Sequence, residues 1–380
     1  MPRDALADNP RATPARPMPP RSTSRPAPPA PPTAAADDDA LAAQRRPVTL
    51  HQVAEAAGVS LMTVSRALNT PERVSPDALA RVKAAVARTG YIPNLLAGGL
   101  KSRRSQTVGV LVPLIAVAQF LPTIQTLTAT LEAAGYQVIL AQTGYDRTRE
   151  PALVDTLLGR RIDALVVAGL LQDAQAIARL RAARLPVVET WDLTGRPVDQ
   201  VVGFSHPQVG AAVAGHVLAR GWEAVGVATG DDARAMQRLQ GFVGTFGREV
   251  PVATVATPGT LDKGRQALAR LLAAQPGLRV VVCSSDALAQ GVVTEALERG
   301  LRVPQDLAVV GFGDAEFAAH MAPSLTTVRI DAAAIGREAA RRVLARCRGE
   351  RLDDPVADLG FHLVERRSTR EDAPGGPRSA

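Results

Sequence analysis

Short, continuously apolar runs rich in β-branched residues recur along the chain from residue 107 onward, and helical stretches separate most of them. The runs are VGVLVPL, YQVILAQ, DALVVAG, LPVVETWD, AVGVATG, RVVVCSSD and LAVVGFGD. Strands that are apolar on both faces belong to a parallel sheet covered by helices on each side. The pattern therefore predicts a doubly wound α/β body over residues 107–367, and its length of roughly 260 residues predicts two lobes.

Residues 47–92 follow a different pattern, which predicts three short helices. Hydroxyl side chains stand where N-caps are needed, and glycines stand where helices must end. The predicted N-caps are Thr49, Ser60 and Ser75, and the predicted helix ends are Gly58 and Gly90. Two helices joined by a tight glycine turn and supported by a third form a helix-turn-helix. We therefore predict an all-α DNA-binding domain over residues 47–92.

The second of these helices has two distinct faces. Its inward stripe, at helical spacing, consists of Val64, Ala67 and Leu68. The residues left outside are Leu61, Met62, Ser65, Arg66 and Asn69. In a helix-turn-helix the second helix enters the major groove of DNA, and its early exposed residues reach the base edges. Leu61 and Met62 could instead be core residues, but the inward stripe is already filled, which favours contact with DNA.

The positive charge of the chain is concentrated at its N-terminal end. Residues 1–107 hold 15 Lys and Arg and 8 Asp and Glu, which leaves 29 of the 44 basic residues and 29 of the 37 acidic residues for the rest of the chain. The whole excess of +7 therefore lies in the N-terminal part. A basic module joined to a neutral body indicates that the module binds a polyanion and that the body has another task.

Cysteine content and hydropathy exclude several classes of protein. Two cysteines, Cys283 and Cys347, are too few for a disulfide framework or a Cys-rich metal site, so we expect reduced thiols. No run approaches 18 apolar residues, which predicts no membrane span. The first residues are rich in Pro, Arg and Ala and lack an apolar segment, so we expect no secretory signal and a cytoplasmic, nucleoid-associated protein. Residues 1–46 and 368–380 are predicted to be disordered tails.

Two rival functions lack the motifs that they require. A sugar-metabolising enzyme should carry a catalytic motif, but the sequence has no G-x-x-x-x-G-K-[ST] loop, no H-E-x-x-H and no G-x-S-x-G, and its five histidines are scattered singly. A sugar-binding protein of the periplasm would need a signal peptide and would have no helix-turn-helix. We therefore predict that the chain is not an enzyme and that it uses no cofactor and no metal.

Several motifs in combination carry a resemblance to a known family. The run VTLHQVAEAAGVSLMTVSRALN, the GYIPN of residues 90–94, and the later VPQDLAVVGFGD and PSLTTVRID resemble the LacI/GalR family of bacterial transcriptional regulators over about residues 47–367. Within that family, LMTVSRALN, QTGYD, ETWD and VGFSH look like the branch of gluconate-operon repressors. The resemblance implies a helix-turn-helix domain, a hinge over residues 93–106 and a two-lobed sensor domain like periplasmic binding proteins. Its first lobe would comprise about residues 107–202 and 330–349, and its second lobe about residues 203–329 and 350–367.

The resemblance also implies how DNA is bound. Family members read bases with the two residues after the N-cap of the second helix and with an Arg further along, which here are Leu61, Met62 and Arg66. Arg66 can pair with guanine, and the two apolar residues can contact thymine methyl groups. Other DNA-facing positions, which orient the domain on the backbone or belong to the hinge, are Thr49, Ser60, Thr63, Ser65, Asn69, Ser75, Tyr91, Asn94, Ala97 and Leu100. Leu100 matches the hinge Leu that wedges into the minor groove.

The sensor domain of the family binds its effector between the lobes, at the carboxyl ends of strands. The candidates from the first lobe are Gln119, Phe120, Tyr145, Trp191 and Asp192, and those from the second lobe are Arg238, Ser285, Asp286 and Asp314. Arg238 matches an Arg that commonly holds the polar group of the ligand, which suits a sugar acid. Trp191 is either a stacking surface or a core residue, and Asp286 is either a ligand contact or a helix N-cap. The sequence departs from the family at Gly313, where many relatives have an Asp, so the role of Asp314 stays open.

These expectations combine into one mechanism. The chain would bind a palindromic operator in double-stranded DNA as a homodimer, or as a tetramer, because half-sites one turn apart need two recognition helices related by a twofold axis. A small effector, expected to be a sugar acid such as gluconate, would close the lobes, separate the paired hinges and release the operator. The chain would therefore be a repressor of sugar-acid catabolism genes.

Overall fold

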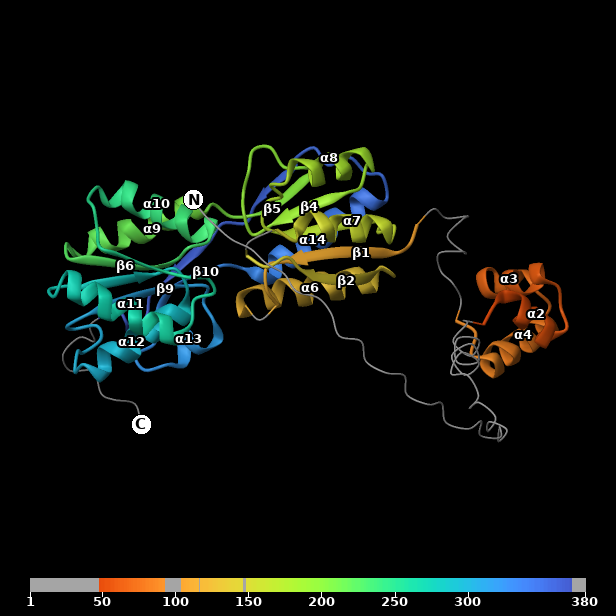
Figure 1. The fold of residues 1–380 in the computed structure, drawn as a ribbon, viewed down its shortest axis with the longest axis horizontal. Helices are drawn as coiled ribbons and strands as arrows, with labels where there is room; N and C mark the ends of the chain where they lie inside the picture. The colour runs from red at the N-terminus through yellow and green to blue at the C-terminus, as the bar shows by residue number, and fades with distance from the viewer. Residues whose placement is uncertain (1–47, 93–103, 116, 146–147, 371–380) are drawn as a thin grey trace, which may run out of the picture. The chain divides into compact units, whose positions relative to one another are not determined.

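The computed structural model describes residues 48–92, 104–115, 117–145 and 148–370. The chain divides into two compact units after residue 94 (Figure 1). The predicted tail over residues 1–46 and most of the predicted hinge lie outside the described residues. Among the residues described, no helix is both long enough and apolar enough to span a membrane.

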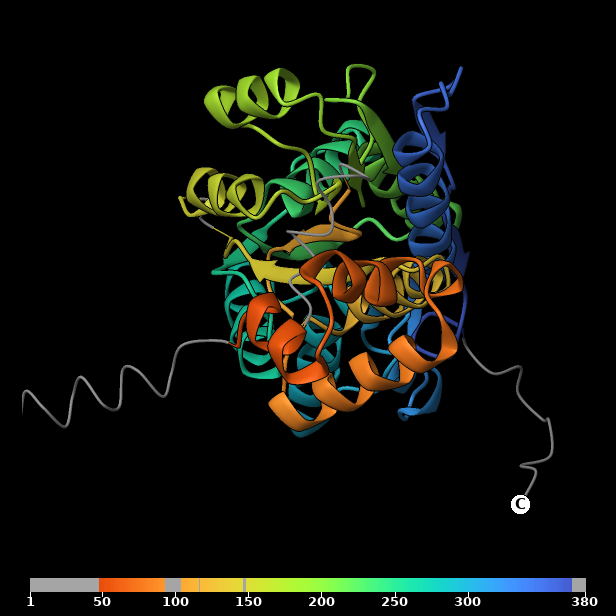
Figure 2. The ribbon, with the colours of Figure 1, turned by 90° about the vertical axis from the view of Figure 1, so that its right-hand side faces the viewer.

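The first unit is all-α, as predicted. Its elements are α2 (Leu50–Ala57), α3 (Leu61–Asn69), the 3₁₀ turn η1 (Pro71–Arg73) and α4 (Pro76–Thr89), drawn in red to orange in Figure 2. All three predicted N-caps are confirmed: the hydroxyls of Thr49, Ser60 and Ser75 each accept a hydrogen bond from the backbone N–H three residues on. Gly58 and Gly90 end α2 and α4 in the left-handed conformation, with φ of 61° and 66°. The three helices pack around Val53, Val64 and Val82.

The second unit contains two lobes, each built on a six-stranded sheet. In the first lobe the strand order is β11-β5-β4-β3-β1-β2, and every neighbouring pair is parallel. The strands are β1 (Thr107–Val112), β2 (Gln137–Gln142), β3 (Ala164–Ala168), β4 (Val187–Thr190), β5 (Gln200–Gly203) and β11 (Val356–Asp358). Helices α6 (Leu121–Ala133) and α14 (Ala332–Cys347) cover one face, and α7 (Glu150–Gly159) and α8 (Ala174–Ala182) cover the other.

The second lobe repeats this architecture. Its strand order is β12-β10-β9-β8-β6-β7, and only the pairing of β12 with β10 is antiparallel. The strands are β6 (Val225–Gly230), β7 (Val252–Val255), β8 (Val280–Cys283), β9 (Ala308–Phe312), β10 (Thr326–Arg329) and β12 (His362–Val364). Helices α9 (His206–Ala219) and α10 (Ala233–Phe246) cover one face; α11 (Leu261–Ala274) and α12 (Asp286–Glu298) cover the other. The short α13 (Glu316–His320) follows β9 in this lobe. In the first lobe, the 3₁₀ turn η2 (Ala118–Phe120) precedes α6. The doubly wound α/β prediction is confirmed.

Two predicted boundaries are wrong. The segment 350–367 does not belong to the second lobe alone, because β11 extends the first sheet beside β5 before β12 joins the second sheet. The predicted tail over residues 368–380 also begins too early. Ser368 is buried and donates from its hydroxyl to the Val309 carbonyl at 2.6 Å, so this residue belongs to the second lobe. Residues 371–380 lie outside the described part of the chain.

Candidate functional site

Helix α3 presents apolar side chains to solvent at its N-terminal end. Leu61 is 38% exposed and Met62 is 62% exposed, whereas Val64 is fully buried in the core of the helical unit. Arg66 is exposed one turn further along. Leu61 and Met62 are therefore not core residues, and the outward face of α3 offers two apolar side chains and one guanidinium.

The hydroxyl and amide residues expected around DNA already have partners within the helical unit. The caps Thr49, Ser60 and Ser75 bind the starts of their helices. The Thr63 hydroxyl lies 2.9 Å from that of Ser60, and the Asn69 amide donates to the Ser65 carbonyl at 2.8 Å. Tyr91 packs against the helical core. Asn94, Ala97 and Leu100 lie outside the described residues.

In the second unit, a cavity of about 420 Å³ lies between the two lobes. This interlobe cavity is lined by the carboxyl ends of strands, as predicted for an effector site. The lining residues of the first lobe include Pro113, Thr143, Tyr145, Glu150 and Gly169, and those of the second lobe are Asp231, Asp232, Ala233, Arg234 and Thr257. Its volume falls within the range of small-molecule sites, about 300–1,000 Å³. Of the predicted ligand residues, Tyr145 is the one found in its lining.

Charged groups are held in fixed positions on the second-lobe side of the interlobe cavity. Asp232 is the N-cap of α10: one carboxylate oxygen accepts from Ala235 N at 3.1 Å and the other from the Thr257 hydroxyl at 3.2 Å. Asp231 accepts from Thr257 N at 2.8 Å, and hydrogen bonding from Thr257 holds the pKa of this carboxyl below its usual value. Arg234 is 9% exposed, and its guanidinium lies 5.3 Å from the centre of the Phe120 ring.

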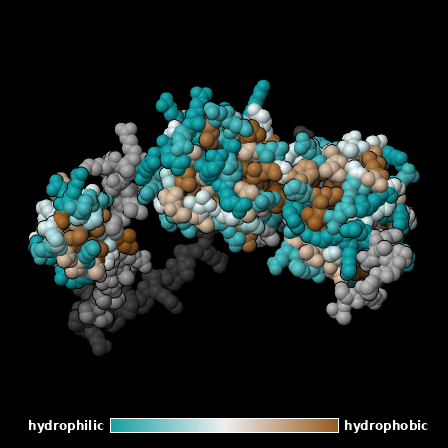
Figure 3. Space-filling view, turned by 180° about the vertical axis from the view of Figure 1, so that it is seen from behind, coloured by the Kyte–Doolittle hydropathy of each residue, from teal (hydrophilic) through white to brown (hydrophobic). Residues whose placement is uncertain are grey.

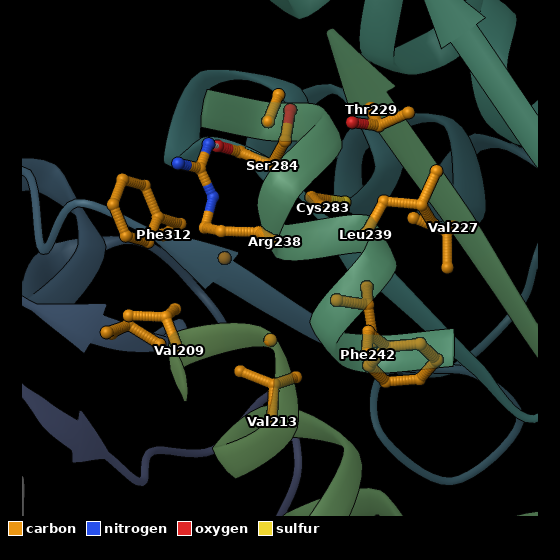
Figure 4. Close-up of a pocket in the computed structure, with 15 residues that line it drawn as sticks. Val209, Val213, Val227, Thr229, Arg238, Leu239, Phe242, Cys283, Ser284 and Phe312 are labelled. Carbon is orange, nitrogen blue, oxygen red and sulfur yellow. Dashed lines mark hydrogen bonds between the residues drawn. The ribbon is translucent and has the colours of Figure 1, made fainter. Parts of the chain in front are cut away.

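Arg238 does not line the interlobe cavity. It lines a separate, mainly apolar cavity of about 30 Å³ inside the second lobe, together with Val209, Val213 and Phe312 (Figure 4). Its guanidinium donates to Nδ1 of His206 at 2.9 Å and to the Ser284 carbonyl at 3.0 Å, and lies 3.9 Å from the centre of the Phe312 ring. Burial lowers the pKa of Arg238 to about 10, so the side chain stays charged.

Trp191 is a core residue, so its prediction as a stacking surface is wrong. The residue is 2% exposed, and its ring makes edge contacts with Phe120 at 4.9 Å and Phe204 at 6.0 Å between ring centres. Its indole N–H donates to the Thr123 hydroxyl at 3.0 Å. Its backbone has a φ of 65° at this strand end. Phe120 is equally buried, at 1%.

Asp192, the other first-lobe candidate beside Trp191, is also buried. It is 7% exposed, and its carboxylate accepts from the backbone N–H of Leu193 at 3.0 Å. The aromatic residues and Asp192 are therefore buried and do not line the interlobe cavity.

The two acidic residues of the second lobe that were predicted to bind the ligand, Asp286 and Asp314, already have partners within the protein. Ser285, not Asp286, is the N-cap of α12, so the capping alternative for Asp286 is wrong. Asp286 is buried and accepts from the Thr327 hydroxyl at 2.6 Å and from Ala315 N at 2.7 Å; burial raises its pKa to about 6. Asp314 has a φ of 49° and forms ion pairs with Arg366 and Arg329.

Gln119 approaches this cluster from the first lobe. A Cβ atom on Gly313 would lie 3.6 Å from a carboxylate oxygen of Asp286 and 3.7 Å from the side-chain oxygen of Gln119. Gln119, Asp286 and Gly313 therefore meet, whereas Tyr145 lies with Arg234 in the interlobe cavity. The predicted ligand residues do not form a single group.

Sequence reasoning missed several lining residues and one buried histidine. Asp231, Asp232 and Arg234 directly follow the AVGVATG strand, so the strand-end rule used for the other candidates would have found them. His206, which binds Arg238, ends the VGFSH motif, but nothing in that motif indicated a contact with an arginine. Among the described residues, no three or more His, Cys, Asp and Glu side chains gather as they would around a metal ion.

The family profile described as "Bacterial regulatory proteins, lacI family" matches residues 49–94, and the profile described as "Periplasmic binding protein-like domain" matches residues 214–369. The HTH-type transcriptional regulator GntR of Pseudomonas aeruginosa is 34% identical over 328 residues, which cover 84% of this chain and 95% of that protein. A solved LacI-family transcriptional regulator from Silicibacter pomeroyi is 32% identical, covers 86% of this chain and 100% of its own, and has a TM-score of 0.80.

Two further solved structures contain ligands. The lac repressor dimer bound to operator and an anti-inducer is 27% identical, with a TM-score of 0.73, and covers 85% of this chain and 99% of its own. The complex of the transcriptional regulator CelR with cellobiose is 30% identical, with a TM-score of 0.61, and covers 85% of this chain and 100% of its own. With the helix-turn-helix and the two-lobed α/β unit, these matches establish that the chain belongs to the LacI family of bacterial transcriptional regulators and is a DNA-binding regulator, not an enzyme.

Proposed function

We propose that this regulator represses genes of sugar-acid catabolism, that it binds a palindromic operator as a homodimer, and that a gluconate-like effector releases it. The observation that carries the proposal is the interlobe cavity of about 420 Å³, which is lined by strand ends of both lobes. A ligand that contacts both lobes stabilises the arrangement in which both sets of contacts are made. Binding in this cavity can therefore change how the second unit, the sensor unit, holds the first unit of each chain, the DNA-binding unit.

Operator recognition is assigned to the outward face of α3. Met62 and Leu61 offer apolar contact to thymine methyl groups, and Arg66 can donate two hydrogen bonds to a guanine. Specificity would then come from one polar contact and a few apolar contacts in each half-site. The hinge residues Asn94, Ala97 and Leu100 would add minor-groove contact at the centre of the operator.

The homodimer is supported by the symmetry that a palindromic operator requires, and the surface of the sensor unit offers apolar side chains that an interface could cover. Large apolar side chains are exposed there, and Figure 3 shows brown, hydrophobic patches among teal residues over both lobes. The exposed residues include Ile115, Leu121, Leu218, Leu261, Leu297 and Leu359. Association of two chains would remove part of this apolar surface from water. Sedimentation of the full chain distinguishes a dimer from a tetramer, and a monomer at micromolar concentration would contradict the proposal.

The test of the effector uses the full chain and DNA that the chain itself selects. Genomic fragments bound by the purified protein define the operator. Gel shifts on that operator are then compared with and without gluconate and a panel of related sugar acids. We expect gluconate to weaken operator binding. Unchanged affinity across the panel would overturn the effector class, and tighter binding would overturn the proposed release.

A further inference from the structure

We propose that the sensor unit carries a second DNA-binding surface, on which Arg160, Arg161 and Arg184 bind phosphates of the DNA. The inference rests on the DNA binding that the family match establishes and does not depend on the effector. Arg160 and Arg161 precede β3, and Arg184 precedes β4. The chain enters the sensor unit through Ser105 and Gln106, which precede β1. Because β1, β3 and β4 are consecutive parallel neighbours, these segments lie side by side at the edge formed by the amino ends of the strands, the amino edge.

Arg161 and Arg184 occupy a backbone position that is glycine at the ends of other helices. Each donates its backbone N–H to the carbonyl three residues back, at 2.9 Å and 3.0 Å, and each has a left-handed φ, of 55° and 53°. The same turn ends α6, α9, α12 and α14, where the residue is Gly135, Gly221, Gly300 and Gly349. A side chain with a Cβ atom is less stable than glycine in this conformation. Helices α7 and α8 therefore end on strained arginines, which indicates that these residues have a task other than ending a helix.

The three arginine side chains are exposed and unpaired. Within residues 104–115, 117–145 and 148–370, the structure gives them no hydrogen bond and no ion pair. Two carboxylates close to them in the sequence have other partners. Asp163 accepts from the backbone N–H groups of the entering chain, and Asp155 pairs with Arg179 at 3.0 Å. The guanidinium groups are therefore available to an external anion.

The carboxyl ends of α7 and α8 also attract cations, which is an alternative explanation for arginine at these positions. Each helix end carries only about half a negative charge, whereas the three guanidinium groups carry three positive charges. A positive excess remains in the middle of the amino edge. Exposed carboxylates of this edge, namely Glu132, Asp353 and Asp354, precede the two outermost strands, β2 and β11, so they lie at its flanks.

DNA is the polyanion that the chain brings to this edge. Residues 93–103 join Arg104 to the DNA-binding unit, and even a fully extended segment of this length spans about 40 Å at most. The Asp163 carboxylate fixes the arriving chain directly beside β3. Arginine binds phosphate through paired, charge-assisted hydrogen bonds. A duplex held by the DNA-binding unit is therefore tethered close to these unpaired arginines.

The experiment measures the affinity of the full chain for a genomic fragment that it selects, over a range of salt concentrations. Each neutralised phosphate adds about 0.9 to the slope of log affinity against log salt. We expect Arg161→Gly/Arg184→Gly to bind at least about fivefold more weakly than the wild type in low salt and to lower the slope by about two. Its melting temperature should stay equal or rise, because glycine relieves the left-handed positions. Arg160→Ala should lower the slope by about one.

Two further variants are controls. Arg161→Lys/Arg184→Lys keeps the charges and should keep the slope. Arg337→Ala removes an exposed arginine from α14, roughly 15 Å before the end of that helix at Cys347. Arg104 donates to the Cys347 carbonyl, so the end of α14 lies at the amino edge and Arg337 lies away from it. Arg337→Ala should bind DNA as the wild type does.

Wild-type affinity and slope in Arg161→Gly/Arg184→Gly would overturn the inference and leave the arginines to the helix ends. Weaker binding with an unchanged slope would also overturn it, because the loss would then not come from phosphate contacts. If the double glycine variant does not fold, Arg161→Asn/Arg184→Asn carries the test with the same expected slope, because asparagine adopts the left-handed conformation and has no charge.

Discussion

Nη1 of Arg238 lies 2.9 Å from Nδ1 of His206, and Nε2 of the same ring lies 2.9 Å from the Trp191 carbonyl. Arginine can only donate and a carbonyl can only accept, so Nδ1 carries no hydrogen and Nε2 carries one. His206 is therefore neutral. Burial, followed by the charges of Arg238 and Arg234, lowers the pKa of His206 to about 2.

The neutral state of His206 makes the sensor unit sensitive to acid. The unfolded chain takes up a proton near the ordinary histidine pKa of 6.5, while the folded chain does not, so stability falls as the pH drops below 6.5. Between pH 8 and pH 6 this single group should remove about 1 kcal/mol from the free energy of unfolding. The expected result is a lower melting temperature of the wild type at pH 6. His206→Gln should show a smaller change, and an equal change in both proteins would contradict the assignment.

Helices α9 and α10 are in close backbone contact at Gly210. A Cβ atom at this position would overlap the Arg238 carbonyl oxygen, and backbone cannot move aside as a flexible side chain can. We expect Gly210→Ala to lower the free energy of unfolding by about 1–3 kcal/mol. Gly215→Ala on the same helix is the control, because nothing lies within 4 Å of the added atom and alanine favours the helix by about 0.5–1 kcal/mol. Thermal unfolding measures both variants, and a destabilised Gly215→Ala would refute the packing argument.

The strands that the sequence predicts are those whose apolar runs are continuous. The five strands it missed are at most four residues long, and β7 alternates exposed and buried residues, as an edge strand does. The segment 350–367 was misplaced because β11 and β12 have three residues each, which is too short for a hydrophobic pattern to tell which sheet they join.

The site was harder to predict than the fold. The position of Trp191 at a strand end could be read from the sequence, but the side on which its ring lies could not, and the structure places the ring in the core. Arg234 and Arg238 are four residues apart on α10, so they lie on the same face of the helix. Only the packing around that face decides which of them reaches the interlobe cavity.

The start of the sensor unit is held by Asp163. Its carboxylate accepts from Ser105 N at 2.9 Å and from Gln106 N at 2.8 Å, at the point where the chain arrives from the predicted hinge. We expect Asp163→Ala to reduce the change in operator affinity that gluconate causes, because the linker is no longer fixed to the residue that precedes β3, while gluconate affinity itself is unchanged. Gel shifts and calorimetry test this, with the exposed Asp353→Ala as the control. A full gluconate response in Asp163→Ala would exclude this anchor from the coupling.

Arg66 and Met62 should differ in what their loss does to operator binding. If Arg66 pairs with a guanine, Arg66→Ala should lose about 1–3 kcal/mol of discrimination at one G·C position and tolerate other bases there. Met62→Ala should instead weaken preference for thymine at its own position, because apolar contact with a methyl group is lost. Arg73→Ala, at an exposed position outside α3, should leave every base preference intact. Binding to a library of single-base operator variants measures all three. If Arg66→Ala weakens binding to every variant equally and lowers the salt dependence by about one ion, then Arg66 binds phosphate and α3 reads bases through apolar contacts alone.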